Sequence, residues 1–81
     1  DHPGADYFRT RIEESRRSFR TGFQAMADEG LLAPGIDADY AATSTFALWD
    51  GVQIHWLIDP DSVSVIDTLR QHLRLITVVD I

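Results

Sequence analysis

The segment from Ala38 to Ile58 constrains the fold most, because as a helix it is apolar around its whole circumference. Its apolar side chains from position 46 onwards are Phe46, Ala47, Leu48, Trp49, Val52, Ile54, Trp56, Leu57 and Ile58. At about 100° per residue these side chains point in nearly every direction, and a helix that is apolar all round is buried all round. Two flanking helices cannot surround a third. We therefore expect a second subunit or further polypeptide to cover it.

A first helix is predicted over about residues 3–29. Its apolar positions follow one another at steps of three and four, and they are Phe8, Ile12, Ser15, Phe19, Phe23 and Met26. Pro3 suits the first helical turn, where its missing N–H is no loss. Gly30 suits the left-handed residue that ends many helices.

The remaining helices are predicted over residues 38–58 and 62–79. Pro34-Gly35 interrupts regular structure, and Asp37 is a favourable N-cap for the middle helix. Either Asp59 or Asp61 is expected to cap the third helix, whose apolar seam is Ile66, Leu69, Leu73 and Ile76. Short turns between helices give antiparallel neighbours. The chain is therefore predicted to be all-α, with three antiparallel helices forming part of a larger bundle.

Composition limits both stability and function. A chain of 81 residues without cysteine is near the lower size limit for an independent core, so oligomerisation is expected. The net charge is −6 and all 7 basic residues are arginines. Five of them cluster around Glu13 and Glu14 in the first helix, at positions 9, 11, 16, 17 and 20. We expect internal ion pairs there and no direct contact with DNA.

Neither a membrane span nor a signal peptide is predicted. No apolar run reaches the roughly 18–20 residues that cross a bilayer, and the amino terminus lacks a basic region followed by an apolar one. The chain begins without methionine, which suggests a piece of a longer protein. A cytoplasmic location is the default expectation.

Two polar residues on the middle helix indicate a small-molecule site. Asp50 and Gln53 are three residues apart, on the side of the helix that carries Phe46 and Trp49. Polar groups set among apolar ones are typical of ligand pockets. The predicted ligand-binding residues are Phe19, Phe23, Phe46, Trp49, Asp50 and Gln53. In the alternative interpretation, Asp50 pairs with an arginine of the first helix and Gln53 bonds to a neighbouring backbone.

The order of several motifs resembles the carboxy-terminal part of TetR-family transcription regulators. The block DGVQIHWLIDPD at 50–61 is similar to the end of their penultimate helix. HPGADYFRTRIEESR at 2–16 and GLLAPGIDADYAA at 30–42 resemble the preceding helix and its connecting turn, and the seam of the third helix fits the terminal helix. Together these motifs cover nearly the whole chain.

Membership of this family implies three features. One is a homodimer in which the last two helices of each subunit form a four-helix bundle. Another is a pocket for a small-molecule effector against the penultimate helix. The third is an amino-terminal helix-turn-helix, outside this chain, that binds DNA. The residues expected at the dimer interface are Leu48, Val52, His55, Leu69, Leu73 and Ile76.

Other chemistry is not expected. The histidines at 2, 55 and 72 lack metal-ligand spacing, the five glycines form no phosphate loop, and no catalytic motif is present. We therefore predict no metal, no cofactor and no enzymatic activity. A free-standing helical module that binds a protein partner is the alternative function. A helix-turn-helix encoded upstream would separate the two.

Overall fold

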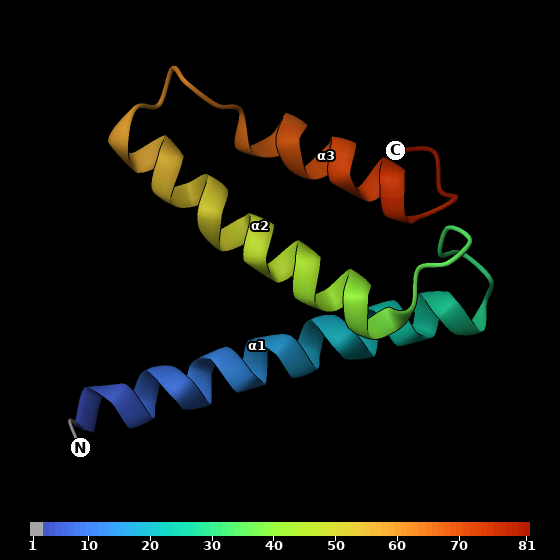
Figure 1. Cartoon of the computed structure of the whole chain (residues 1–81), viewed down its shortest axis with the longest axis horizontal. Coiled ribbons are helices and arrows are strands. Elements are labelled where there is room, and N and C mark those ends of the chain that lie inside the picture. The colour runs from blue at the N-terminus through green and yellow to red at the C-terminus, as the bar shows by residue number, and fades with distance from the viewer. Residues whose placement is uncertain (1–2) are drawn as a thin grey trace.

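The computed structural model describes residues 3–81 and contains three helices (Figure 1). Helix α1 spans Pro3–Asp28, α2 spans Ala38–Ile58 and α3 spans Val65–Ile76. Within the described residues the only strand-like element is one isolated bridge, between Leu32 and Thr77. The prediction of an all-α chain with three helices is therefore confirmed.

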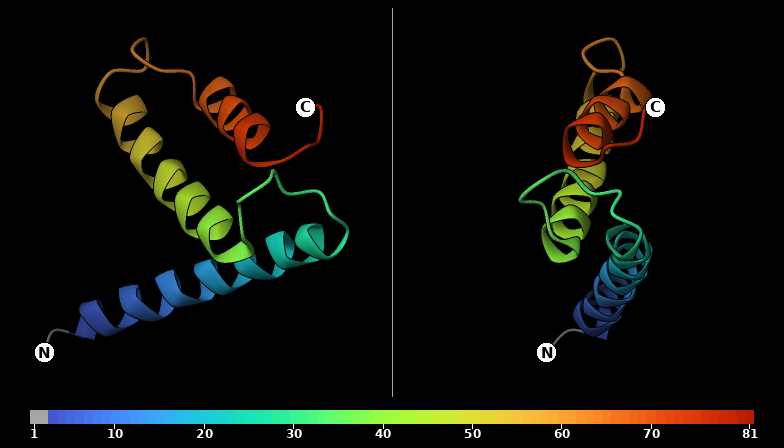
Figure 2. Two further views of the ribbon diagram at one scale, coloured as in Figure 1. Left: turned by 45° about the vertical axis from the view of Figure 1, so that its right-hand side comes forward. Right: turned by 90° about the vertical axis from the view of Figure 1, so that its right-hand side faces the viewer.

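Helix α2 lies between the other two. It packs against both α1 and α3, whereas the backbones of α1 and α3 stay apart throughout residues 3–81. Helices α2 and α3 form an antiparallel hairpin (Figure 1). Helix α1 crosses the beginning of α2 obliquely, so that the amino end of α1 and the carboxyl end of α2 diverge (Figures 1 and 2).

The chain is flat. Its extents are 42 × 33 × 15 Å, and an α-helix with its side chains is about 10–12 Å across. The right-hand view of Figure 2 shows this thin profile. Three helices in so flat an arrangement cannot enclose α2, and much of its apolar surface is uncovered.

The turn between α1 and α2 follows the predicted local chemistry. Gly30 has a φ of 72°, the left-handed region that glycine adopts without strain. The backbone N–H of Leu31 donates to the carbonyl of Met26 at 2.9 Å, and that of Gly30 donates to Ala27 at 3.0 Å. This is the Schellman arrangement. The carboxylate of Asp37 caps α2 by accepting from the Tyr40 N–H at 2.8 Å.

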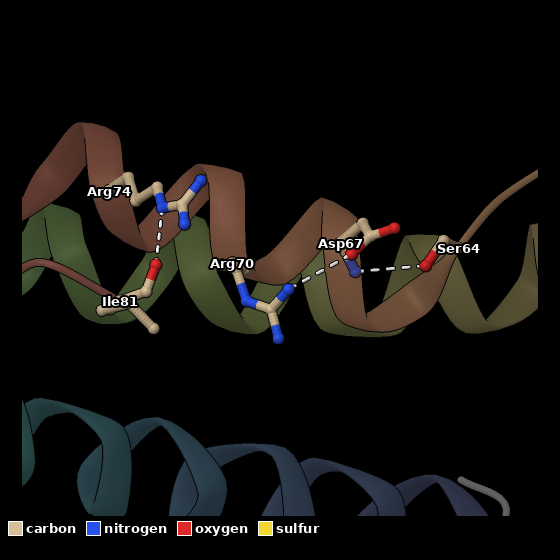
Figure 3. Close-up of polar contacts among 5 residues, drawn as sticks. All are labelled: Ser64, Asp67, Arg70, Arg74 and Ile81. Atoms are coloured by element: carbon tan, nitrogen blue, oxygen red, sulfur yellow. Dashed lines mark hydrogen bonds and ion pairs between the residues drawn. The ribbon is translucent and has the colours of Figure 1, made fainter.

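The predicted start of α3 was wrong. The helix begins at Val65 and not at 62, because the hydroxyl of Ser64 caps it by accepting from the Asp67 N–H at 3.2 Å (Figure 3). Asp59 instead holds the preceding turn. Its carboxylate accepts from the N–H of Asp61 at 3.2 Å, and its carbonyl accepts from the Ser62 hydroxyl at 2.7 Å.

The predicted end of α3 at residue 79 was also wrong. The helix ends at Ile76, and its C-cap Thr77 has an extended backbone. There the Val78 N–H donates to the carbonyl of Leu31 at 2.8 Å, and the Ala33 N–H donates to Ile76 at 2.9 Å. The β-branched run 77–79 thus pairs with the turn after α1 instead of continuing the helix. Figure 3 shows a further hydrogen bond at this end, in which the Nε–H of Arg74 donates to the carbonyl of Ile81 at 2.7 Å.

The hydrophobic core is small and lies at one end of the chain. It forms where the carboxyl ends of α1 and α3 meet the start of α2, and its buried members are Phe23, Ala38, Ala41, Ala42 and Ile76. The alanines allow α1 to approach α2 closely. At the far end of α2, by contrast, Leu57 and Ile58 are 72% and 80% exposed.

Candidate functional site

A groove separates the diverging parts of α1 and α2. Its volume is about 510 Å³, within the range of about 300–1,000 Å³ that is usual for small-molecule sites. Helix α1 contributes one wall and α2 the other, and the lining residues are Tyr7, Phe8, Arg11, Ile12, Ser15, Phe46, Trp49 and Asp50. The lining residues come from the parts of α1 and α2 that diverge in Figure 1.

Aromatic rings form most of the apolar surface of the groove. At its inner end the Phe46 ring lies 5.7 Å from that of Phe19, measured between centroids, with an interplanar angle of 39°. Phe19 in turn packs against the buried core. Nearer the mouth, Trp49, Tyr7 and Phe8 are exposed. The groove therefore has a rigid base and an exposed aromatic rim.

Two charged side chains face the groove from opposite helices. The guanidinium of Arg11 lies over the Tyr7 ring at 5.9 Å from its centroid, and it donates to the Tyr7 hydroxyl at 3.4 Å. Asp50 is exposed, and within residues 3–81 it forms no ion pair or side-chain hydrogen bond. The alternative in which Asp50 pairs with an α1 arginine is therefore not realised. Its carboxylate is available to a ligand.

The structure brings together three of the six predicted ligand-binding residues. Phe46, Trp49 and Asp50 line the groove, and Phe19 supports it from behind. Phe23 is 7% exposed and belongs to the core. It also borders a separate apolar hollow of about 400 Å³ that lies over the carboxyl half of α1. Gln53 is half-buried and is not among the lining residues.

Sequence reasoning missed the contribution of α1 to this groove. Tyr7 and Arg11 were assigned no ligand role, although they form part of its wall. Phe8 and Ile12 were recognised as apolar positions at helical spacing, and that spacing predicts a face packed on a neighbour. They are instead exposed because α1 tilts away from α2. An apolar stripe does not reveal this tilt.

The residues expected at a dimer interface lie mostly between α2 and α3. Val52 and Ile76 are 5% and 4% exposed, so they pack inside the chain and offer almost no area to a partner. Leu48, Leu69 and Leu73 are half-buried, and only His55 is exposed. Leu69, Leu73 and Ile76 of the α3 seam pack toward α2 of their own chain, whereas Ile66, at the start of the seam, is 68% exposed. The large exposed apolar side chains in the carboxyl half of α2 beyond the groove and in α3 are Ile54, Trp56, Leu57, Ile58, Ile66 and Leu75.

A polar contact that the sequence did not indicate joins α2 to α3. The Nε2 atom of His72 lies 3.1 Å from the hydroxyl of Thr45 and 3.4 Å from that of Ser44. Thr45 is buried. Burial lowers the pKa of His72 below its ordinary value, so the neutral imidazole is favoured. The contact is therefore a neutral hydrogen bond between helices.

No cluster of three or more histidine, aspartate or glutamate side chains suited to a metal occurs among residues 3–81. None of the helices there combines the length and hydrophobicity needed to cross a membrane.

The chain matches no family model, no curated protein and no solved structure. The resemblance to TetR-family regulators therefore remains a prediction from the order of the sequence motifs.

Proposed function

We propose that this chain is the effector-binding and dimerisation part of a TetR-type transcription regulator that acts in the cytoplasm. A helix-turn-helix head outside this sequence would bind the operator. The observation that carries the proposal is the α1/α2 groove, in which an unpaired Asp50 lies beside Phe46 and Trp49. An aromatic groove with one free carboxylate is suited to binding a small molecule.

The groove favours an effector with an aromatic or apolar body and a cationic or hydrogen-bond-donating end. The body would lie against Phe46 and Trp49, and its donor would meet the carboxylate of Asp50. Covering Asp50 with a molecule that lacks a donor would leave a desolvated charge without a partner, which costs several kcal/mol. Such molecules should therefore bind more weakly than donors of the same shape, and this difference would give the site its specificity.

The tilt of α1 provides a route from the effector to the rest of the protein. Helix α1 packs on α2 near the alanine-rich crossing, whereas Phe8 and Ile12 in its amino half are 67% and 41% exposed. A ligand between the two walls would favour one angle of α1 over others. Its influence is limited to the difference between its affinities for those angles.

The uncovered end of α2 supports the dimerisation part of the proposal. Leu57 and Ile58 are among its most exposed side chains, and a second copy packed there would bury them. Pairing of the α2–α3 hairpin with its symmetry mate would give the four-helix bundle that the resemblance implies. A specific interface of this kind buries at least roughly 1,200 Å² in total.

Tryptophan fluorescence tests the effector site directly. The W56F variant leaves Trp49, in the groove, as the only indole, and the matched W49F variant leaves only Trp56. We expect cationic aromatic compounds to change the emission of the W56F variant with saturation and to leave that of W49F unchanged. Equal responses of both variants to every compound, or no saturable response in either, would contradict an effector site in this groove.

Operator release tests the regulatory role. Compounds that saturate the groove should release the full regulator from its operator DNA in a gel-shift assay. Two observations would favour the free-standing interaction module instead. One is a stable monomer that binds a different protein, and the other is a gene that encodes no helix-turn-helix upstream of this segment.

A further inference from the structure

A second hollow lies at the crossing of α1 and α2 and shares no lining residue with the effector groove. Its volume is about 350 Å³. Most of its lining comes from one face of α1, with the start of α2 opposite, and the residues are Glu13, Arg16, Arg17, Arg20, Asp39, Ala42 and Thr43. The four α1 residues follow at steps of three, one and three, which places them on one side of the helix.

Arg20 connects the two walls of this hollow. Its Nε atom lies 2.9 Å from the carboxylate of Asp39 in the first turn of α2. The ion pair holds the guanidinium across the two helices and leaves its terminal N–H groups available. A guanidinium has five N–H donors, so one carboxylate oxygen does not saturate it.

Arg16 and Arg17 are available as well. Glu13 lies three and four residues before them, at spacings that often form ion pairs, yet neither arginine is ion-paired within residues 3–81. At the same spacing of three, Asp6 does pair with Arg9 and Asp67 pairs with Arg70. The network of ion pairs expected around Glu13 and Glu14 is therefore absent. Two unpaired guanidiniums remain beside the anchored one.

We propose that this hollow binds a phosphate group of a small phosphorylated molecule. Guanidinium groups match phosphate oxygens with two parallel N–H donors, and the hydroxyl of Thr43 offers a further donor at the opposite wall. Three arginines against the carboxylates of Glu13 and Asp39 leave one net positive charge here, in a chain whose net charge is −6. The hollow is therefore positively charged, whereas the chain as a whole is negatively charged.

Glu13 makes the proposal testable by a gain of binding. Its carboxylate lines the hollow and repels a phosphate, so E13Q should tighten binding by on the order of threefold to tenfold at low ionic strength. E14Q is the matched control, because it changes the net charge equally from the next position, which does not line this hollow. We expect less than about a twofold effect from E14Q, because its charge is screened at greater distance.

The measurement is a titration with inorganic phosphate and then pyrophosphate, at constant ionic strength, followed by NMR of the backbone and arginine Nε–H signals. Saturable shifts at Thr43, Arg16 and Arg17 are expected. R17Q should abolish them, whereas R9Q, which removes a paired arginine of the same helix, should preserve them. Dispersed spectra of each variant establish that it is folded.

Three results would overturn the proposal. The first is an equal effect of E13Q and E14Q, which would indicate general screening. The second is non-saturable shifts spread over Arg70 and Arg74 as well. The third is binding of a short DNA duplex without binding of phosphate or pyrophosphate, which would assign the arginines to nucleic acid.

Discussion

Replacing the two most exposed apolar residues of α2, as L57Q/I58Q, should dissociate a dimer without unfolding its subunits. Leu57 and Ile58 are 72% and 80% exposed in the single chain. Fully burying such a side chain contributes about 1.5–3 kcal/mol. Scaled by these exposed fractions, each residue would contribute about 1–2.4 kcal/mol to dimerisation if a partner covers it.

The effect is multiplied by symmetry. Summed over two residues in each of two subunits, the lost dimerisation free energy is about 4–9 kcal/mol, which is an upper estimate. It corresponds to a dimer dissociation constant raised by about three orders of magnitude or more. Within the subunit the same substitutions remove few contacts, so the free energy of unfolding of the monomer should change by no more than about 0.5 kcal/mol for each site.

Sedimentation equilibrium over a range of concentrations measures the dimer constant, and circular dichroism reports the helices. F8Q is the matched control, because Phe8 is 67% exposed but lies on α1, far along the chain from the hairpin. The reasoning is refuted if L57Q/I58Q keeps the parent's dimer constant, or if F8Q weakens the dimer as much.

Three further outcomes are expected. L73D should unfold the chain, because it strands a charge where Leu73 packs on the core, at a cost of several kcal/mol; an unchanged melting temperature would contradict this. D50N should preserve folding and operator binding while weakening the binding of cationic effectors by about tenfold, since it removes the one carboxylate among the described lining residues of the groove; an unchanged effector affinity would remove Asp50 from the site. Because burial lowers the pKa of His72, the folded state binds fewer protons than the unfolded state, so its stability is greatest above about pH 6.5 and falls as the pH decreases below that value. H72Q should weaken this dependence and H55Q, at an exposed site, should not; urea melts at several pH values measure both, and the same pH dependence in H72Q would exclude His72 as its cause.

The helix boundaries that the sequence predicted correctly depend on local chemistry. Gly30 and Asp37 each act within a few residues, the one through its left-handed φ and the other through a bond to Tyr40. The ends of α3 could not be predicted in this way. At its start, Ser64 is the N-cap, although Asp59 and Asp61 were equally suitable by residue type. At its end, Val78 bonds to Leu31, a residue distant in sequence.

Only the α2 wall of the groove could be predicted from the sequence, for a similar reason. The apolar and polar positions of α2 indicate which of its residues face a ligand, but the position of the other wall depends on how α1 crosses α2. That crossing is close where Ala38, Ala41 and Ala42 lie. Farther along, the rings of Phe19 and Phe46 lie between the helices, and interaxial distance depends on the side chains at the contact. The angle between α1 and α2 therefore depends on contacts along both helices together, which the pattern of either helix alone does not reveal.

The proposed effector and dimer surfaces occupy successive lengths of the same helix. Phe46, Trp49 and Asp50 line the groove, whereas Leu57 and Ile58 lie beyond it at the uncovered end of α2. Between them, Val52 is buried inside the chain. On the proposed function, α2 is therefore a fixed element that a partner holds at one end and α3 supports along its side. An effector that fills the groove would then move α1 in preference to α2, since among the described helices α1 packs against α2 alone, whereas α2 packs against both α1 and α3. Ala41 is 0% exposed at the crossing of α1 and α2, so A41L should displace α1 and destabilise the subunit by about 1–3 kcal/mol. Where circular dichroism shows the variant folded, Trp49 titrations should report a larger change in effector affinity than sedimentation reports in the dimer constant, and the opposite order would contradict this role of α1.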